Sequence, residues 1–267
     1  MEYLLYLGVG ALAGLLGGLL GIGGGLVIVP VLVYSFQSHA FDPEVLTQMA
    51  IATSLATITF TSVSSVKAHH ERGAVRWDLV RLLAPGIVLG TLIGAEVAHR
   101  LPGRSLQLLI GLFAMLMALQ MFSNWRPGGT QAEPPPLPGK RGLFAGGSII
   151  GLASALFGIG GGSLTVPWLN YHGTRMQEAV ATSSACGMAI AVAGTLGFVA
   201  TGLRAHNLPE QAIGYVYLPA FIGISISSVL FARVGVRLAH RLPAATLKKV
   251  FAVLLVVVGI QLISGVQ

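Results

Sequence analysis

Glycine runs and hydroxyl pairs are the residues of this chain whose types and spacing could do chemistry. The run GIGGG occurs at 21–25 and again at 158–162, each time inside an apolar stretch, and Ala-Thr-Ser occurs at 52–54 and 181–183. Glycine lets a ligand approach the backbone, and a helix that begins at such a run presents free N–H donors and the positive end of its dipole. These residues therefore indicate binding of a small anion.

We expect one substrate site to combine the glycines of both runs with the hydroxyl pair that follows each. Hydroxyls can instead bond to carbonyls of their own helix, and glycines in membrane helices are often packing surfaces. We favour a helix break at each glycine run because the glycines are consecutive, cover every face of a helix and recur, and we favour a cavity-facing role for the repeated Ala-Thr-Ser motif. The predicted site residues are Gly21, Gly23, Gly24, Gly25, Thr53, Ser54, Gly158, Gly160, Gly161, Gly162, Thr182 and Ser183.

Residues for catalysis or metal binding do not form a recognisable pattern. The single cysteine, Cys186, has no partner at a metal-ligand spacing, and no nucleophile–base pair or intramembrane carboxylate pair is evident. No Lys-Ser/Thr follows either glycine run, which disfavours a phosphate-binding loop. We therefore predict a protein that is not an enzyme, with no cofactor and no bound metal.

The composition is that of a membrane protein. Hydrophobic residues make up 54% of the 267 residues and charged residues only 9%, whereas a soluble domain carries about 25% charged residues. The net charge of +7 could suggest nucleic acid, but Lys and Arg also collect in the cytoplasmic loops of membrane proteins. We expect the partners to be a lipid bilayer and a small anionic substrate, with a second copy of the chain possible and no nucleic acid.

The chain is built from two related halves. Residues 14–32 and 151–169 are identical at eleven of nineteen positions, and AHRLP at 98–102 recurs at 239–243. We therefore divide the chain into a first membrane repeat (1–123), a cytoplasmic linker rich in proline and glycine (124–140) and a second membrane repeat (141–267).

Each half contains one glycine-broken apolar segment followed by three ordinary spans. The broken segments are 3–33 and 142–170, and the spans lie near 47–66, 78–99, 104–122, 178–200, 211–232 and 246–265. Each span is close to the roughly 20 residues that cross a bilayer core. The glycines at 10, 14 and 18, and those at 86, 90 and 94, have the spacing of helix-packing faces.

The basic residues indicate how the chain crosses the membrane. If each broken segment crosses once, the 16 Lys and Arg residues divide evenly between the two sides. If each segment returns to its starting side, as a re-entrant hairpin or as two crossings, they divide 13 to 3, which the positive-inside rule prefers. We therefore predict an all-α polytopic membrane protein of two inverted-topology repeats, with both termini outside.

The duplicated motif G-x-G-G-G-x-x-x-V-P-x-L, followed by A-T-S, resembles that of the TauE/SafE-type sulfite exporters, and the resemblance covers both halves. It includes Pro30 and Pro167. The resemblance implies a multi-pass protein of the bacterial inner membrane that exports a sulfur-containing anion such as sulfite or sulfoacetate.

The predicted mechanism is alternating access, because inverted repeats with interrupted helices are a recurring transporter architecture. The anion would be held at the midplane by the N-termini of the two broken helices. Two alternatives remain open from the residues: transport of another small organic anion in either direction, and an anion channel.

Overall fold

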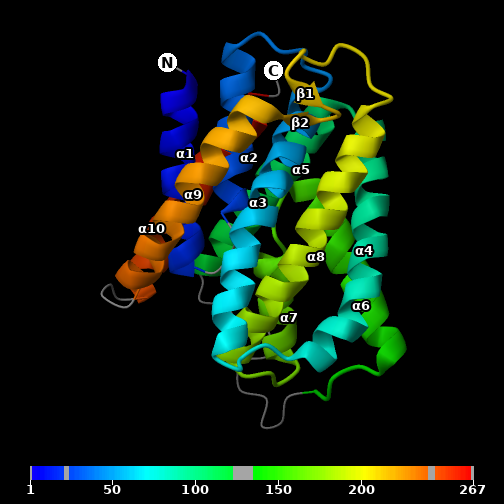
Figure 1. Ribbon diagram of the computed structural model, residues 1–267, viewed down its shortest axis with the longest axis vertical. Helices are drawn as coiled ribbons and strands as arrows, with labels where there is room; N and C mark the ends of the chain where they lie inside the picture. Colours follow the sequence, from blue (N-terminus) through cyan, green and yellow to red (C-terminus); the bar gives the residue numbers. More distant parts are fainter. Residues whose placement is uncertain (1, 21–23, 123–134, 240–243, 266–267) are drawn as a thin grey trace.

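The computed structural model describes residues 2–20, 24–122, 135–239 and 244–265, and within these ranges the chain forms ten helices and one short β-hairpin (Figure 1). The predicted all-α membrane fold is confirmed. The first half contains α1 (Glu2–Leu20), α2 (Gly25–Ser38), α3 (Leu46–Glu71), α4 (Trp77–Arg100) and α5 (Gly103–Phe122). The second half contains α6 (Lys140–Phe157), α7 (Gly162–Tyr171), α8 (Met176–Gly202), β1 (Ala212–Ile213), β2 (Val216–Tyr217), α9 (Leu218–Ala239) and α10 (Ala244–Ser264).

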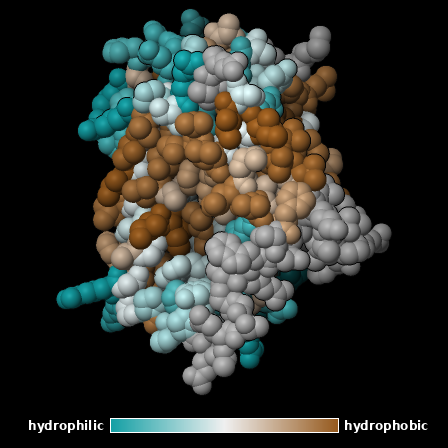
Figure 2. Space-filling view, turned by 180° about the vertical axis from the view of Figure 1, so that it is seen from behind, coloured by the Kyte–Doolittle hydropathy of each residue, from teal (hydrophilic) through white to brown (hydrophobic). Residues whose placement is uncertain are grey.

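Several helices are suited to cross a bilayer. Helices α3, α4 and α8, together with residues 103–120 of α5, are long and apolar enough to do so, and shorter apolar stretches lie in α1, α2, α9 and α10. Figure 2 shows a broad hydrophobic band between hydrophilic ends of the molecule. The chain is therefore a multi-pass membrane protein.

Both glycine runs interrupt a helix, as expected. Gly24, the first break, directly precedes α2, and residues 158–161, the second break, separate α6 from α7. Residues 21–23 lie outside the described residues. Helix α7 has ten residues and rises about 15 Å, half of a bilayer core of about 30 Å. In Figure 1, α1 begins at the end of the molecule that carries both termini, and α6 begins at the opposite end. The two broken helix pairs therefore begin at opposite ends of the molecule.

The two halves pack mainly against each other. Helix α1 packs on α9, and its counterpart α6 packs on α4, which is the counterpart of α9. The corresponding helices α5 and α10 also pair, as do α3 and α8. The core therefore lies between the halves.

Glycine faces bring the paired helices close, as the spacing predicted. A Cβ atom on Gly14 would overlap the backbone of Ser228 in α9, and one on Gly90 would overlap the carbonyl of Ser148 in α6. Gly10, Gly86 and Gly94 make similar close approaches. The surroundings of Gly18 lie outside the described part of the chain.

One predicted span begins in the wrong place. The apolar run from 211 was expected to be helical, but residues 212–217 form the antiparallel hairpin β1–β2, and α9 begins at Leu218. Gly214, with φ of +54°, provides the turn, and Pro219 suits the first turn of a helix. Of the predicted linker, residues 124–134 lie outside the described residues, 135–139 have no regular structure, and α6 begins at residue 140.

Candidate functional site

The two breaks share one backbone geometry. Gly24 precedes α2 with φ 75° and ψ −11°, and Gly161 precedes α7 with φ 75° and ψ −13°. This left-handed conformation costs other L-residues roughly 1–2 kcal/mol. The glycine at each position therefore has a conformational reason, and both half-helices begin in the same way.

Both half-helices begin without a side-chain cap. The N–H groups of the third and fourth residues of α2 and α7 donate to the carbonyl of Gly24 and of Gly161, respectively. The N–H groups of the first two residues have no acceptor among the described residues. Three of these four residues are buried. The free donors belong to Gly25, Leu26, Gly162 and Ser163.

The second break lies against the start of α2. A Cβ atom on Gly25 would overlap the carbonyl oxygen of Gly158 and would lie 3.1 Å from the Cα of Ile159. The structure thus brings Gly25, from the first glycine run, into contact with the second run. Gly21 and Gly23, which were also predicted for the site, lie outside the described residues.

Helices α3 and α8 flank the second break. The Ser54 hydroxyl, from α3, donates to the carbonyl of Gly158 at 2.9 Å. Gly187, from α8, approaches the carbonyl of Gly160 so closely that a Cβ atom would overlap it. The helices that carry the two Ala-Thr-Ser motifs therefore hold the second break between them.

The two threonines of these motifs have matching roles. The N–H of Tyr217 donates to Thr53 Oγ1 at 3.0 Å, and the N–H of Arg76 donates to Thr182 Oγ1 at 3.1 Å. Tyr217 directly precedes α9, and Arg76 directly precedes α4. Each threonine therefore accepts a bond from the residue before a long helix of the other half and links the two halves.

The two serines differ. Ser54 is bonded to the second break, whereas Ser183 Oγ is buried and has no partner among the described residues. Three further buried hydroxyls without partners among the described residues belong to α6 and α7, the helices before and after the second break in the chain: Ser154, Ser163 and Thr165. The sequence prediction did not include these three, although the comparison of the two halves contained a signal: their counterparts are Gly17, Leu26 and Ile28.

A cavity of about 230 Å³ lies between α2, α5 and α10. Pro30, one turn beyond Gly25, lines it together with Gln37, Gln107 and Gln261. Its lining has hydrogen-bonding groups but no charged side chain among the described residues.

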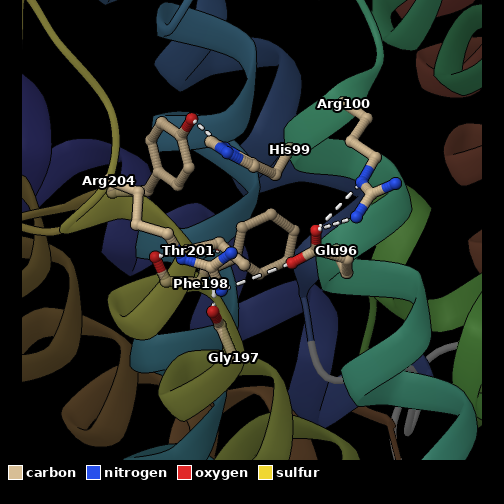
Figure 3. Close-up of polar contacts among 8 residues, drawn as sticks. Glu96, His99, Arg100, Gly197, Phe198, Thr201 and Arg204 are labelled. Atoms are coloured by element: carbon tan, nitrogen blue, oxygen red, sulfur yellow. Dashed lines mark hydrogen bonds and ion pairs between the residues drawn. The ribbon is translucent and has the colours of Figure 1, made fainter.

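Polar contacts at the end that carries the termini attach the segment between α8 and α9 to α4 (Figure 3). Glu96 pairs with Arg100 at 2.8 Å and with Arg204 at 3.5 Å, and His99 Nδ1 lies 2.8 Å from the Tyr215 hydroxyl. Burial raises the pKa of Tyr215, so its phenol is neutral at physiological pH. The two arginines are largely exposed, and we assign this cluster a structural role.

The chain matches a known family over nearly its whole length. A family model described as sulfite exporter TauE/SafE matches residues 6–262. The chain belongs to this family. The match includes both breaks and both Ala-Thr-Ser motifs.

Relatives agree with this membership. A probable membrane transporter protein of Haemophilus influenzae is 39% identical to this chain, and the match covers 97% of each chain. The probable membrane transporter protein YunE of Bacillus subtilis is 27% identical over 98% of each chain. The probable membrane transporter protein MamO of Magnetospirillum gryphiswaldense is 26% identical, over 97% of this chain but only 45% of MamO. No solved structure matches the chain. The chain is thus a membrane transporter of the TauE/SafE family.

Proposed function

We propose that this transporter exports a small sulfur-containing anion, either sulfite or an organosulfonate such as sulfoacetate. The anion binds at the N-termini of α2 and α7, and the two halves move relative to each other to give alternating access. The membrane is the bacterial inner membrane, with both termini on the periplasmic side.

The observation that carries this proposal is the pair of uncapped helix N-termini inside the protein. Buried N–H groups without an acceptor are costly, and an anion with several oxygens would satisfy them. Free N–H donors and the helix dipole both favour negative charge at this position. The first residue of α2 contacts Gly158 and Ile159 of the second break, and helix N-termini with free donors favour an anion rather than a cation.

Electrostatics favour outward movement of the anion. A negative cell interior favours the exit of each negative charge by about 2.3 kcal/mol per 100 mV. A dianion gains about twice that amount, so export needs no coupling ion. The 13-to-3 division of basic residues supports the orientation in which α6 begins on the cytoplasmic side.

Contacts between the halves support alternating access. The second break touches Gly25 and Ser54, which belong to the first half. A shift of one half against the other would therefore change the surroundings of the site.

Two alternative functions are transport of another small organic anion in either direction and an anion channel. Saturable counterflow distinguishes a transporter from a channel.

The test is counterflow in proteoliposomes with sulfite, sulfoacetate and taurine. We expect saturable exchange of at least one sulfur-containing anion, and we expect Gly161→Leu to abolish it while the protein still inserts. Gly73→Leu is the matched control, because Gly73 also has a positive φ, of +65°, but no atom within 4 Å of an added Cβ. Unimpaired exchange by Gly161→Leu would refute the site, and non-saturating flux would favour the channel.

A further inference from the structure

The second break is surrounded by hydroxyls that have no hydrogen-bond partner among the described residues. Ser154 and Thr165 are fully buried, with 0% of each residue exposed, and their hydroxyls and that of Ser163 are unpartnered. A Cβ atom on Gly161 would lie 3.4 Å from Thr165 Oγ1 and 3.7 Å from Ser154 Oγ. Two of the three hydroxyls therefore surround the turn from which α7 begins.

A structural role does not account for these hydroxyls. An unpaired buried hydroxyl lowers stability, and an apolar residue of similar shape would avoid this cost. The first break shows that the turn does not need them: its left-handed glycine and uncapped helix are the same, but its counterpart residues are Gly17, Leu26 and Ile28. The hydroxyls thus belong to the second half alone.

We propose that the second break is the oxyanion subsite of the transporter. The hydroxyls of Ser154, Ser163 and Thr165, together with the N–H groups of Gly162 and Ser163, donate to the oxygens of the substrate, whereas the first break contributes backbone N–H groups alone. This inference rests on the proposed function and deepens it, because it assigns recognition of the oxygens to one half.

The donor set defines a ligand class. Three hydroxyls and two N–H groups suit an anion with three oxygens on one atom, as in sulfite or a sulfonate, better than a carboxylate with two. The Cδ1 atom of Ile190, from α8, lies where a Cβ atom of Gly161 would be. This atom is the end of a side chain, so the proposed binding step includes a rotamer change of Ile190.

The experiment removes the hydroxyls one at a time and follows both transport and stability. We expect Thr165→Val and Ser154→Ala each to raise KM for sulfite counterflow about tenfold, while the thermal unfolding temperature stays the same or rises. Thr165→Ser keeps the hydroxyl and should keep KM within about twofold. In Thr165→Val and Ser154→Ala, inhibition of sulfite counterflow by methanesulfonate should weaken more than inhibition by acetate.

Two control variants isolate the effect. Ile28→Val changes the counterpart of Thr165 in the first half, and Thr201→Val removes a buried hydroxyl that already donates to the carbonyl of Gly197. Both should leave KM for sulfite unchanged.

The outcomes separate the two proposals. If Thr165→Val and Ser154→Ala exchange sulfite with the KM of the unmodified protein, or lose stability as they lose activity, the oxyanion subsite is overturned and the proposed function stands. If the unmodified protein exchanges no sulfur-containing anion, both proposals are overturned.

Discussion

Gly24 and Gly161 begin α2 and α7 with nearly the same backbone angles, yet the side chains around the two turns differ. The second turn is surrounded by serine and threonine hydroxyls, whereas the first has Leu26 and Ile28 at the corresponding places. The shared glycine geometry shows what a half-helix needs in order to begin inside the protein. The unshared hydroxyls are the observation on which the proposed oxyanion subsite rests.

The Ala-Thr-Ser motifs divide in the same way. Thr53 and Thr182 accept equivalent bonds from backbone N–H groups of the opposite half. Ser54 donates to the second break, but Ser183 has no partner among the described residues. The two threonines therefore have equivalent partners, and the two serines do not.

Alanine at the two left-handed glycines should give the largest effects and should separate the two turns. Both substitutions carry a conformational cost of about 1–2 kcal/mol. A Cβ atom on Gly24 would also lie 2.8 Å from the backbone oxygen of Ala13, which cannot easily move. The atom nearest to a Cβ atom on Gly161 would be Cδ1 of Ile190, at the end of a side chain that can move. We expect Gly24→Ala to lower the free energy of unfolding in detergent by about 3 kcal/mol or more and Gly161→Ala by about 2 kcal/mol. Equal losses would contradict the difference in surroundings.

Valine at the two threonines tests whether they link the halves or bind substrate. Thr53→Val removes the buried 3.0 Å hydrogen bond that Thr53 Oγ1 accepts from the N–H of Tyr217, which should lower the free energy of unfolding by about 2 kcal/mol. Thr182→Val should cost about 1 kcal/mol, because its bond is only partly buried. Thr195→Val is the control, since the Thr195 hydroxyl bonds to the carbonyl of Ala191 in its own helix. A raised KM for the anion with unchanged stability would instead assign Thr53 and Thr182 to the substrate site.

Substituting alanine for Ser54 or Ser183 should give the smallest changes in the free energy of unfolding, and the two changes should differ in sign or be zero for Ser183. Ser54→Ala loses the bond to Gly158 and should lower the free energy of unfolding by about 1 kcal/mol. Ser183→Ala removes a buried hydroxyl without a partner and should be neutral or slightly stabilising. Chemical unfolding of both variants in the same detergent measures the difference. A destabilised Ser183→Ala would indicate a structural role for that hydroxyl.

Two helices could be predicted closely from the sequence, whereas the span expected near 47–66 stops five residues before the end of α3 at Glu71. The spans expected near 78–99 and 104–122 agree with α4 and α5 to within one residue at each end, because apolar length and flanking charges determine where a membrane helix begins and ends. The predicted start of α9, at residue 211, was wrong by seven residues. An apolar run alone does not distinguish a helix from a hairpin.

The site was only partly predictable. The glycine runs identified both breaks, and the inverted topology predicted that they meet. The Thr-Ser pairs were expected to face the ligand, but three of their four hydroxyls bond to backbone of the opposite half. The hydroxyls of Ser154, Ser163 and Thr165 were missed, because their significance depends on which neighbours lack a partner.

The sequence by itself determined that the chain is a membrane protein of two related halves, and that each half carries a break. These properties follow from composition, periodicity and the conformational freedom of glycine, which are local. Only the tertiary structure decided which donors are used and which remain free. Ser54 and Gly158 are separated by 104 residues in the chain, and a hydrogen bond across that separation exists only once the two halves have packed together.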